Sequence, residues 1–226
     1  MSAVVLLSGG IDSTVTLTMA LQEHREVLAL SILYGQSHPE EVEHAAAVAN
    51  YFGRGVYHEI VTLDASLLAT TASSLTGDRA MPDETYEELA EHDGPSPTYV
   101  PFRNGLMLSM ATAKALPFGA DEVWAGMHSE DAAHWAYPDC TPEFIGGMAN
   151  AIYVGTYHQV RLRTPLQWMT KTDVIRAGID LAAPLTLTLS CYRGYPPCGT
   201  CPTCVSRIHA FAEIGIRDPA DAAVRL

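Results

Sequence analysis

The chain has 226 residues, 48% of them hydrophobic and 17% charged, and its 26 acidic and 13 basic side chains give a formal net charge of −13 at pH 7. This length predicts one domain, or one domain with a small appendage, and is ample to bury a core. The charge argues against nucleic acid as a partner, because nucleic-acid binding depends on Lys and Arg that neutralise phosphates. No apolar run is long enough to span a membrane, and the N-terminus lacks the basic and apolar regions of a secretory signal. We therefore expect a cytoplasmic protein that acts on a small molecule and has no membrane partner.

The first predicted element is a strand over residues 3–7, an apolar run typical of a strand buried on both faces of a parallel sheet. It leads into two adjacent glycines, which leave the backbone open to a bulky anion. Asp12 or Ser13 is expected to cap a helix over 13–24, whose N-terminal N–H groups then face the glycines. Strand, glycine turn and helix N-terminus together predict a phosphate cradle. No lysine follows the glycines, which excludes the common P-loop, and an ordinary glycine-rich turn is the alternative.

The next elements alternate between strand and helix. They are a strand over 27–33, a helix over 42–52 and a strand over 56–63. Ser37 and Glu40 are expected to form a capping box before the helix. This order predicts an α/β fold with a doubly wound, mainly parallel sheet, in which ligands bind at the carboxyl ends of the strands.

Residues 70–98 break this alternation. The segment is acidic, polar and proline-bearing, with weak helical content only at 86–90, and long excursions of this kind are usually lids or disordered loops. Regular elements resume after it, in the order helix through 106–116, strand over 121–126, loop over 126–139, helix over 142–153, strand over 160–163 and helix over 170–181, the last capped by Thr170 with Asp173. The loop after residue 126 follows the carboxyl end of its strand, where chemistry is expected.

Four of the five cysteines lie near the C-terminus, at Cys191, Cys198, Cys201 and Cys204. The last three form a C-x2-C-x2-C pattern that lets thiolates converge on one ion, and zinc accepts four thiolates in a closed, tetrahedral, structural site. A disulfide framework is not expected in a cytosolic chain, whereas an iron–sulfur cluster is the main competitor and four unligated thiols the weakest one. Cys140 is an alternative to Cys191 as the fourth ligand. The expected organisation is an α/β domain with the phosphate cradle over 1–185 and a small, helical, zinc-binding segment over 186–226.

Several motifs, taken in chain order, point to a family. Ser-Gly-Gly-Ile-Asp-Ser at 8–13 resembles the SGGxDS loop of the PP-loop, or N-type ATP pyrophosphatase, superfamily, in which the loop grips the pyrophosphate of ATP and AMP is released. The further motifs are Tyr34-Gly35-Gln36 with His38, Tyr99–Asn104, Tyr137–Cys140 with Glu143 and Phe144, Pro165-Leu166 before Lys171, and Ser190-Cys191-Tyr192 before the cysteine pattern. Set in this order, they resemble the 7-cyano-7-deazaguanine synthase family of the queuosine pathway, over nearly the whole chain apart from 70–98 and the extreme C-terminus.

The resemblance implies an ATP-dependent ligase that converts 7-carboxy-7-deazaguanine and ammonia to 7-cyano-7-deazaguanine. The reaction would pass through an adenylated acid and an amide, and would release AMP and pyrophosphate. ATP, Mg²⁺ and Zn²⁺ are the implied bound groups, and a homodimer is the implied assembly. We expect free ammonia or a partner to supply the nitrogen.

The resemblance also assigns nucleotide-binding residues in this chain. They are Leu7, Ser8, Gly9, Gly10, Ile11, Asp12, Ser13, Thr14, Arg103 and Asn104. Asp12 and Lys171 are the expected catalytic residues. Asp12 is expected to bind the metal ion, and Lys171 to neutralise negative charge on the phosphates. A solvated lysine is the alternative for Lys171. Arg103 and Asn104 are expected to contact nucleotide or substrate, and for Asn104 the alternative is helix capping.

Substrate recognition is expected from Tyr137, Asp139 and Glu143, because carboxylates match the N–H donors of a guanine-like edge. Glu143 has an alternative as an acidic first-turn residue, and Cys140 as a buried small hydrophobe. His128 and His134 lie in the same loop, with surface exposure as the default interpretation.

The chain departs from the family pattern around these residues. The family usually has Asp-aromatic-Ser-Gly before Tyr-Pro-Asp-Cys and often Arg after it. This chain has the six residues 131–136 before it, which indicates a two-residue insertion, and Thr141 after it. Phe102 also replaces a usually small residue. The differences cluster at the expected purine pocket, so the alternatives are another 7-deazapurine acid or arrest at the amide. A PP-loop tRNA thiolase, or an amidoligase for another acid, is a separate enzymatic alternative, and the acidic charge argues against the thiolase. A zinc-stabilised nucleotide-binding module is the non-catalytic alternative.

Overall fold

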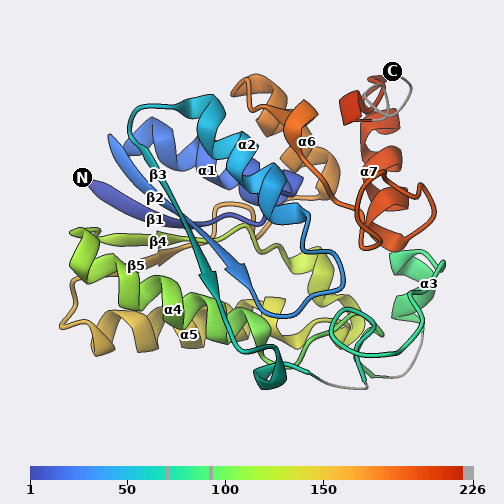
Figure 1. Cartoon of the computed structure of the whole chain (residues 1–226), viewed down its shortest axis with the longest axis horizontal. Coiled ribbons are helices and arrows are strands. Elements are labelled where there is room, and N and C mark those ends of the chain that lie inside the picture. The colour runs from blue at the N-terminus through green and yellow to red at the C-terminus, as the bar shows by residue number, and fades with distance from the viewer. Residues whose placement is uncertain (70–71, 92–93, 221–226) are drawn as a thin grey trace.

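A five-stranded parallel sheet with strand order β3-β2-β1-β4-β5 lies at the centre of the computed structural model, which describes residues 1–69, 72–91 and 94–220 (Figure 1). The strands are β1 (Ser2–Leu6), β2 (Glu26–Leu33), β3 (Val56–Thr62), β4 (Glu122–Trp124) and β5 (Arg161–Arg163). The order reverses direction at β1, where β2 lies on one side and β4 on the other. The predicted doubly wound α/β fold is confirmed, and ligands in such folds bind at this reversal.

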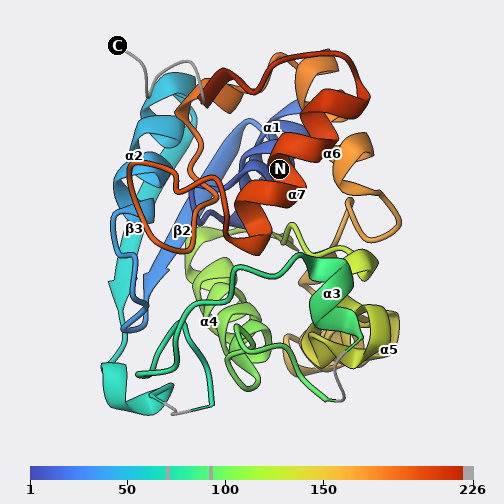
Figure 2. The ribbon, with the colours of Figure 1, turned by 90° about the vertical axis from the view of Figure 1, so that its right-hand side faces the viewer.

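Helices cover both faces of the sheet. One face carries α1 (Ile11–Glu23), α2 (Glu41–Phe52) and α6 (Lys171–Asp180), and the other carries α4 (Arg103–Phe118) and α5 (Pro142–Gly155) (Figure 1). The short α3 (Tyr86–Ala90) and α7 (Pro202–Glu213) lie beyond the carboxyl ends of the strands, beside each other (Figure 2). In the described ranges, every helix is too short or too polar to cross a membrane.

The alternation of side chains along β1 explains how both faces are filled. Val4 packs with Leu108 of α4, while its neighbour Val5 packs with Leu17 of α1 and Val48 of α2. Successive strand residues point to opposite faces, so an uninterrupted apolar run serves two hydrophobic layers at once. The prediction that the first strand is buried on both faces is confirmed.

Several predicted helix starts are wrong. α1 begins at Ile11 with Gly10 as its N-cap and no side-chain cap, so neither Asp12 nor Ser13 caps it. The Ser13 hydroxyl instead accepts the Ser8 N–H at 3.2 Å and donates to the Gly10 carbonyl at 3.1 Å. These bonds hold the glycine turn in shape.

The capping box expected at α2 is also absent. The helix begins at Glu41 after Glu40 and has no side-chain cap, because the Ser37 hydroxyl is bonded to Nδ1 of His38 at 3.3 Å. The capping box of Thr170 and Asp173 at α6 is confirmed.

The irregular segment is partly built into the fold. Residues 70, 71, 92 and 93 of the predicted lid lie outside the described residues. Of the remainder, Leu75 is buried with Tyr34 and Val100, and α3 forms at the position where weak helical content was predicted.

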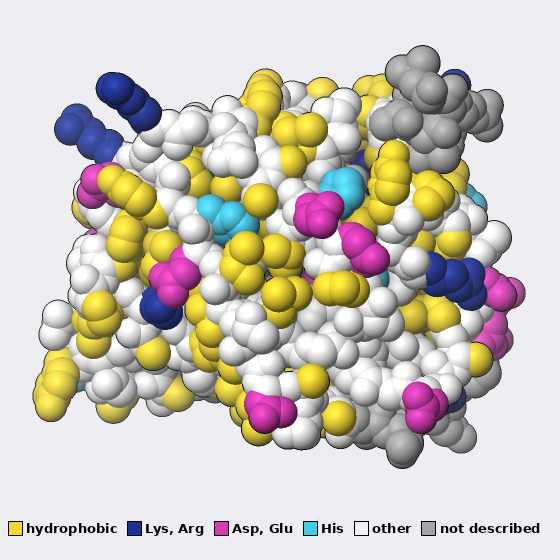
Figure 3. All heavy atoms as spheres, in the orientation of Figure 1, with side chains coloured by type: hydrophobic (Ala, Val, Ile, Leu, Met, Phe, Trp, Pro, Cys, Tyr) yellow, Lys and Arg dark blue, Asp and Glu magenta, His cyan; other side chains and the backbone are white. Residues whose placement is uncertain are grey.

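On the face shown in Figure 3, which includes the β3 edge, Lys and Arg side chains are scattered and form no patch.

Candidate active site

A cavity of about 1200 Å³ opens at the carboxyl ends of β1, β2 and β4. Its floor includes Leu6, Ile32 and Ala125, the residues at or just beyond those strand ends. Its walls come from the connecting segments 7–13, 34–42, 126–140 and 189–192, and from Leu75, Tyr86, Glu91 and Gly94 of the irregular segment. A volume of this size accommodates a nucleotide together with a second small molecule.

The segment 7–13 is packed too tightly to accept a side chain at its first glycine. Gly9 has φ +90°, and a Cβ there would lie 2.4 Å from the carbonyl oxygen of Glu41 and 2.7 Å from the amide nitrogen of Ala45. The turn therefore lies directly against the first turn of α2. Beyond it, the first N–H groups of α1 have no partner inside the helix and carry the positive end of its dipole. This arrangement binds anions such as phosphate.

Asp12 and Lys171 form a close ion pair beside this turn. Nζ of Lys171 lies 2.7 and 2.6 Å from the two carboxylate oxygens of Asp12, which joins the starts of α1 and α6. Burial by itself raises the pKa of Asp12, but the Lys171 ammonium and, more weakly, His128 hold that pKa below its ordinary value. The Lys171 side chain is only 18% exposed and lines the cavity, so the interpretation of a solvated lysine is wrong.

Not every residue expected to contact the nucleotide reaches the cavity. Leu7, Ser8, Gly10, Asp12 and Ser13 line it, together with Arg103 and Asn104. Gly9, Ile11 and Thr14 are absent from the lining, and the last two are buried beneath it. These three support the turn from behind.

Arg103 is the first residue of α4, on the opposite side of the sheet from the glycine turn. Its Nη1 donates to the Tyr34 hydroxyl at 2.9 Å, and its guanidinium lies 5.6 Å from the centre of the Tyr34 ring. Burial by itself lowers the pKa of Arg103, but the nearby Tyr34, Tyr192 and Asp139 together raise it above its ordinary value, so the arginine stays protonated. Burial raises the pKa of Tyr34.

Asn104 does not cap α4, because the helix begins one residue earlier, after Phe102. Its side-chain amide donates to the carbonyl of Asp139 at 3.2 Å and to Sγ of Cys140 at 3.3 Å, while its backbone N–H donates to Asp139 Oδ2 at 3.0 Å. Phe102 adopts φ +57° and packs its ring edge-on to Phe144, outside the cavity. This departure from the family pattern therefore lies away from the expected purine pocket.

The three expected substrate residues are not brought together. Tyr137 lines the cavity, and its hydroxyl is held by Ser96 at 3.1 Å and by Thr98. Asp139 is buried and bound to Asn104, and Glu143 is exposed on the first turn of α5, so neither belongs to the lining. Burial raises the pKa of Asp139, although the Asn104 N–H opposes the shift.

The loop with the insertion forms part of the wall. His128 is buried and lines the cavity, which contradicts the default of surface exposure, whereas His134 is exposed at the rim. Cys140 also faces the cavity, and burial raises the pKa of its thiol.

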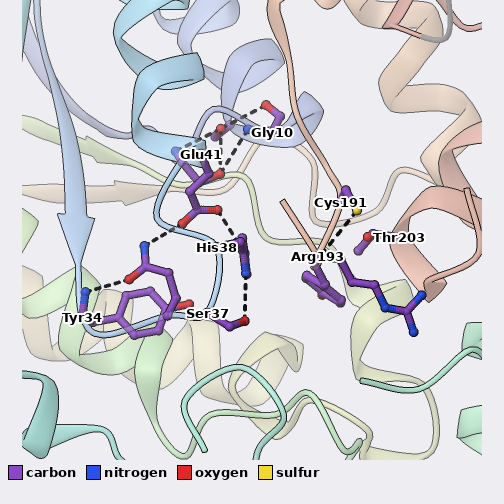
Figure 4. Close-up of polar contacts among 12 residues, drawn as sticks. Gly10, Tyr34, Ser37, His38, Glu41, Cys191, Arg193 and Thr203 are labelled. Atoms are coloured by element: carbon purple, nitrogen blue, oxygen red, sulfur yellow. Dashed lines mark hydrogen bonds and ion pairs between the residues drawn. The ribbon is translucent and has the colours of Figure 1, made fainter. Parts of the chain in front are cut away.

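Sequence reasoning gave no role to several other lining residues. His38 and Glu41 are paired at 3.5 Å, and Gln36 donates to Glu41 at 2.9 Å. In Figure 4, Tyr34, His38 and Glu41 lie opposite Cys191, Arg193 and Thr203 of the C-terminal segment. For Tyr34 and His38, the signal in the sequence was their place in the motif Tyr34-Gly35-Gln36 with His38. Tyr86, whose hydroxyl lies 3.0 Å from that of Tyr192, had none.

The four C-terminal thiols converge on one point. Their sulfur atoms lie within 4.8 Å of one another, with Cys191 and Cys201 4.0 Å apart. A tetrahedral zinc ion with Zn–S bonds of about 2.3 Å requires sulfur atoms roughly 3.8 Å apart. The backbone N–H groups of Arg193 and Cys198 donate to the Cys191 sulfur at 3.3 and 3.4 Å, as suits a thiolate. The donor set therefore fits a metal ion. Its fourth member is Cys191, and the alternative, Cys140, lies outside the cluster and accepts a hydrogen bond from Asn104.

This cysteine loop, residues 189–201, contacts both the glycine turn and the irregular segment. The Leu189 N–H donates to the Gly9 carbonyl at 3.0 Å. On the other side, the Arg193 guanidinium pairs with Asp83 at 2.8 Å and donates to the carbonyl of Met81 at 3.1 Å. The described part of the predicted lid is thus fastened to the cysteine loop and contributes Tyr86 to the cavity wall.

Comparison with known proteins gives a consistent result. The family model for queuosine biosynthesis protein QueC matches residues 2–215. The 7-cyano-7-deazaguanine synthase of Marinomonas sp. is 40% identical over 220 residues, 97% of each chain, and that of Caldicellulosiruptor bescii is 38% identical over 229 residues, 100% of this chain and 99% of the relative.

Solved structures support the fold alone. A 4-thiouridine synthetase–RNA complex with bound ATP matches with a TM-score of 0.53 and 18% identity, over 93% of this chain and 53% of the other. NMN synthetase from Francisella tularensis matches with a TM-score of 0.53 and 15% identity, over 99% of this chain and 81% of the other.

Proposed function

This chain belongs to the QueC family of queuosine biosynthesis proteins and acts in queuosine precursor synthesis as an ATP-dependent ligase, and from that premise we propose that it converts 7-carboxy-7-deazaguanine and ammonia to 7-cyano-7-deazaguanine. The names of the relatives support this product, and the acid and ammonia are what the resemblance to the family implies. The single observation in the structure that carries the proposal is the Asp12–Lys171 pair beside a glycine turn, inside a cavity large enough for two ligands.

The reaction needs two activations and no protein nucleophile. A carboxylate oxygen of the acid attacks the α-phosphorus of ATP and pyrophosphate leaves. Ammonia then attacks the acyl carbon, AMP leaves and a proton is lost, which gives the amide. The amide oxygen attacks a second ATP in the same way, and loss of AMP and two protons leaves the nitrile. The contribution of the protein is positioning and charge stabilisation.

The glycine turn and the start of α1 are proposed to hold the β- and γ-phosphates. Ser8 and Ser13 place their hydroxyls, 3.1 Å apart, at the edge of the turn, where the Gly10 N–H donates to the Ser8 hydroxyl at 3.3 Å. Lys171 is proposed to transfer from Asp12 to the phosphates as ATP binds, because phosphate is the stronger anionic partner. Asp12 is then free to hold Mg²⁺, which supplies charge neutralisation at the pyrophosphate leaving group.

Zinc is the metal we propose for the four cysteines, in a structural role. The all-sulfur donor set, the sulfur separations and the N–H groups directed at Cys191 support it. The tetrahedral site is closed, so the ion would fix the cysteine loop and take no part in the reaction.

The family resemblance supports a homodimer in the cytoplasm that uses free ammonia. The net charge of −13 supports a small-molecule substrate over a nucleic acid. These are proposals about assembly and partners, and each is open to direct measurement by sedimentation, fractionation and tRNA gel shift.

A product assay tests the proposed reaction. Purified protein incubated with the acid, ammonium and Mg-ATP should yield the nitrile, AMP and pyrophosphate by mass spectrometry. The amide as end product would move the assignment to an amidoligase, and ADP with phosphate, or no turnover of the acid, would remove it. Asp12→Ala should abolish AMP formation, whereas a non-catalytic nucleotide-binding module would show no such dependence.

A further inference from the structure

Acidic side chains outnumber Lys and Arg side chains around the cavity. In the described part of the chain, the acidic residues of the lining are Asp12, Glu41, Glu91, Glu130 and Asp131, and the basic ones are Arg103 and Lys171. Both proposed ligands are anions, since ATP carries its phosphates and the acid its carboxylate. An anion that enters a cavity with this balance needs a specific cation to receive it.

The two cations are not equally available. Lys171 is bound through both oxygens of Asp12 and stands beside the phosphate turn. Arg103 forms no ion pair with any carboxylate of the described residues, and its hydrogen bond is to the neutral Tyr34 hydroxyl. A guanidinium offers five N–H donors in a planar fork that matches a carboxylate. Most of this fork is therefore left for a ligand.

Arg103 is also held in place before any ligand arrives. The Tyr34 ring supports the guanidinium plane at 5.6 Å, and the Tyr34 hydroxyl fixes one end of the fork. The next residue, Asn104, anchors the start of α4 to Asp139 through its backbone and side chain. Burial keeps Tyr34 a neutral phenol at ordinary pH by raising its pKa, so it does not neutralise the cation. A part-buried, pre-oriented and unpaired guanidinium is costly without an anionic partner.

We propose that Arg103 binds the carboxylate of the substrate acid through its guanidinium fork, and that the nucleotide is held elsewhere, by the glycine turn and Lys171. This inference rests on the proposed function, and it assigns Arg103 to the acid where the sequence left nucleotide and substrate as alternatives. The carboxylate held at Arg103 presents one oxygen to the α-phosphorus of ATP bound at residues 8–13. In the second activation the substrate is an amide with no negative charge, so the guanidinium has no anion to hold.

That difference provides the test. The two halves of the reaction are measured separately, first from acid to amide and then from added amide to nitrile. Arg103→Met should raise the KM for the acid on the order of 100-fold, the usual loss when a buried charge partner is removed. Its conversion of the amide should stay within about threefold of the unmodified chain. Arg103→Lys keeps the charge without the fork and should give an intermediate loss of roughly tenfold for the acid.

Two control variants bracket the effect. Arg161 is a matched arginine, since its guanidinium lies 4.6 Å from the centre of the Tyr153 ring and donates to the Tyr153 hydroxyl at 3.4 Å, but it lies outside the cavity lining. Arg161→Met should leave both half-reactions unchanged. Tyr34→Phe keeps the ring and removes the bond to Arg103, so it should raise the KM for the acid a few-fold while kcat is retained.

The outcomes separate the two proposals. If the unmodified chain does not turn over the acid, the proposed function fails. If it does, and the Arg103 variants lose both half-reactions equally or neither, the carboxylate assignment is overturned. Unfolding midpoints are measured for each variant, and if Arg103→Met does not fold, the ratio of the two half-reactions in Arg103→Lys decides.

Discussion

The two loops that meet at the cavity, residues 7–12 and the cysteine loop, are held by opposite means. The glycine turn is fixed by regular structure, since β1 precedes it, α1 follows it, and Gly9 packs directly on the backbone of α2. The cysteine loop has no strand or helix of its own before α7. It depends on side-chain contacts, namely those among the four thiols, those of Arg193 with the distant Asp83, and those of Arg207 with Asp218.

This contrast indicates where each loop is vulnerable. A loop held by backbone packing tolerates changes of charge and fails when volume is added. A loop held by side-chain bonds tolerates added volume and fails when one partner is removed, because the other is left buried and unpaired. The following experiments test that distinction, from the largest expected effect to the smallest.

The metal site should matter most to the cysteine loop. Cys201→Ser, or removal of the metal by a chelator, should lower the free energy of unfolding by several kcal/mol, because metal binding in small sites of this kind contributes on the order of 10 kcal/mol. Elemental analysis should find one zinc per chain before treatment and none afterwards. Cys140→Ser is the control and should retain the metal. Full metal content in Cys201→Ser would contradict the four-cysteine site.

Arg207 ties α7 back to the segment before the cysteine loop. It is buried, and its Nε and Nη2 lie 2.6 and 2.9 Å from the carboxylate oxygens of Asp218, while Nη1 donates to Thr188 at 2.8 Å. Arg207→Met should cost about 3–5 kcal/mol of unfolding free energy, since it leaves a buried carboxylate unpaired. The exposed pair of Arg176 and Asp173 is the comparison, and Arg176→Met should cost at most about 1 kcal/mol in denaturant titrations. Equal costs would show that burial is not what makes the first pair important.

The glycine turn should fail when volume is added. Gly9→Ala places a methyl group against backbone atoms at 2.4 and 2.7 Å and in a left-handed conformation, so we expect a loss of about 2–3 kcal/mol and at least tenfold weaker ATP binding. Gly119→Ala shares a positive φ of +75° but meets no atom within 4 Å, and should cost only about 1–2 kcal/mol with ATP binding unchanged. Calorimetry with Mg-ATP distinguishes them. Unchanged ATP affinity in Gly9→Ala would argue against the turn as the phosphate site.

The free energy of unfolding at acidic pH should depend on the Asp12–Lys171 ion pair. The pKa of Asp12 is lowered in the folded chain, so the unfolded chain binds the extra proton first and the stabilisation by this pair is fully present above the unfolded value of about 3.9. It is lost as the pH falls through the lower folded value. Compared with the unmodified chain, Asp12→Asn should lack about 1 kcal/mol at pH 6 and progressively less below pH 4. A difference that does not change with pH would exclude this source.

The smallest effect on stability is expected where the irregular segment is fastened. The Arg193 and Asp83 side chains are 32% and 71% exposed, so Arg193→Gln should cost less than about 1 kcal/mol. Its effect should appear instead as a few-fold higher KM for substrate, because the wall that carries Tyr86 is less firmly held. Asp83→Asn should have the same effect, and the double variant should be no worse than either single one. Additive losses would mean that the two residues act separately.

The part of the molecule that sequence could predict is the part with local causes. The strand at 3–7, the glycine turn and the C-x2-C-x2-C pattern are each determined by residues adjacent in the chain, and the fold and the metal-binding group follow from them. The cavity wall is different. Tyr34 and Arg103 are 69 residues apart and Tyr86 and Tyr192 are 106 apart, and no local pattern records either contact.

The errors have the same physical origin. Asp139 was expected at the substrate, but its carboxylate is used by the Asn104 backbone. Ser37 was expected to cap α2, but the neighbouring imidazole of His38 takes its hydroxyl. In each case the residue type was suited to the predicted bond, and a competing donor or acceptor, which only the folded chain brings near, took its place. The boundary at 185/186 remains a prediction.

The hydrogen bond from the Leu189 N–H to the Gly9 carbonyl has a consequence for any attempt to isolate the phosphate-binding motif from the rest of the chain. A fragment that ends after α6 would contain every residue of the SGGxDS motif but would lack Leu189, whose N–H donates to the carbonyl of the first glycine. The two pieces, expressed separately, should regain nucleotide affinity only when mixed.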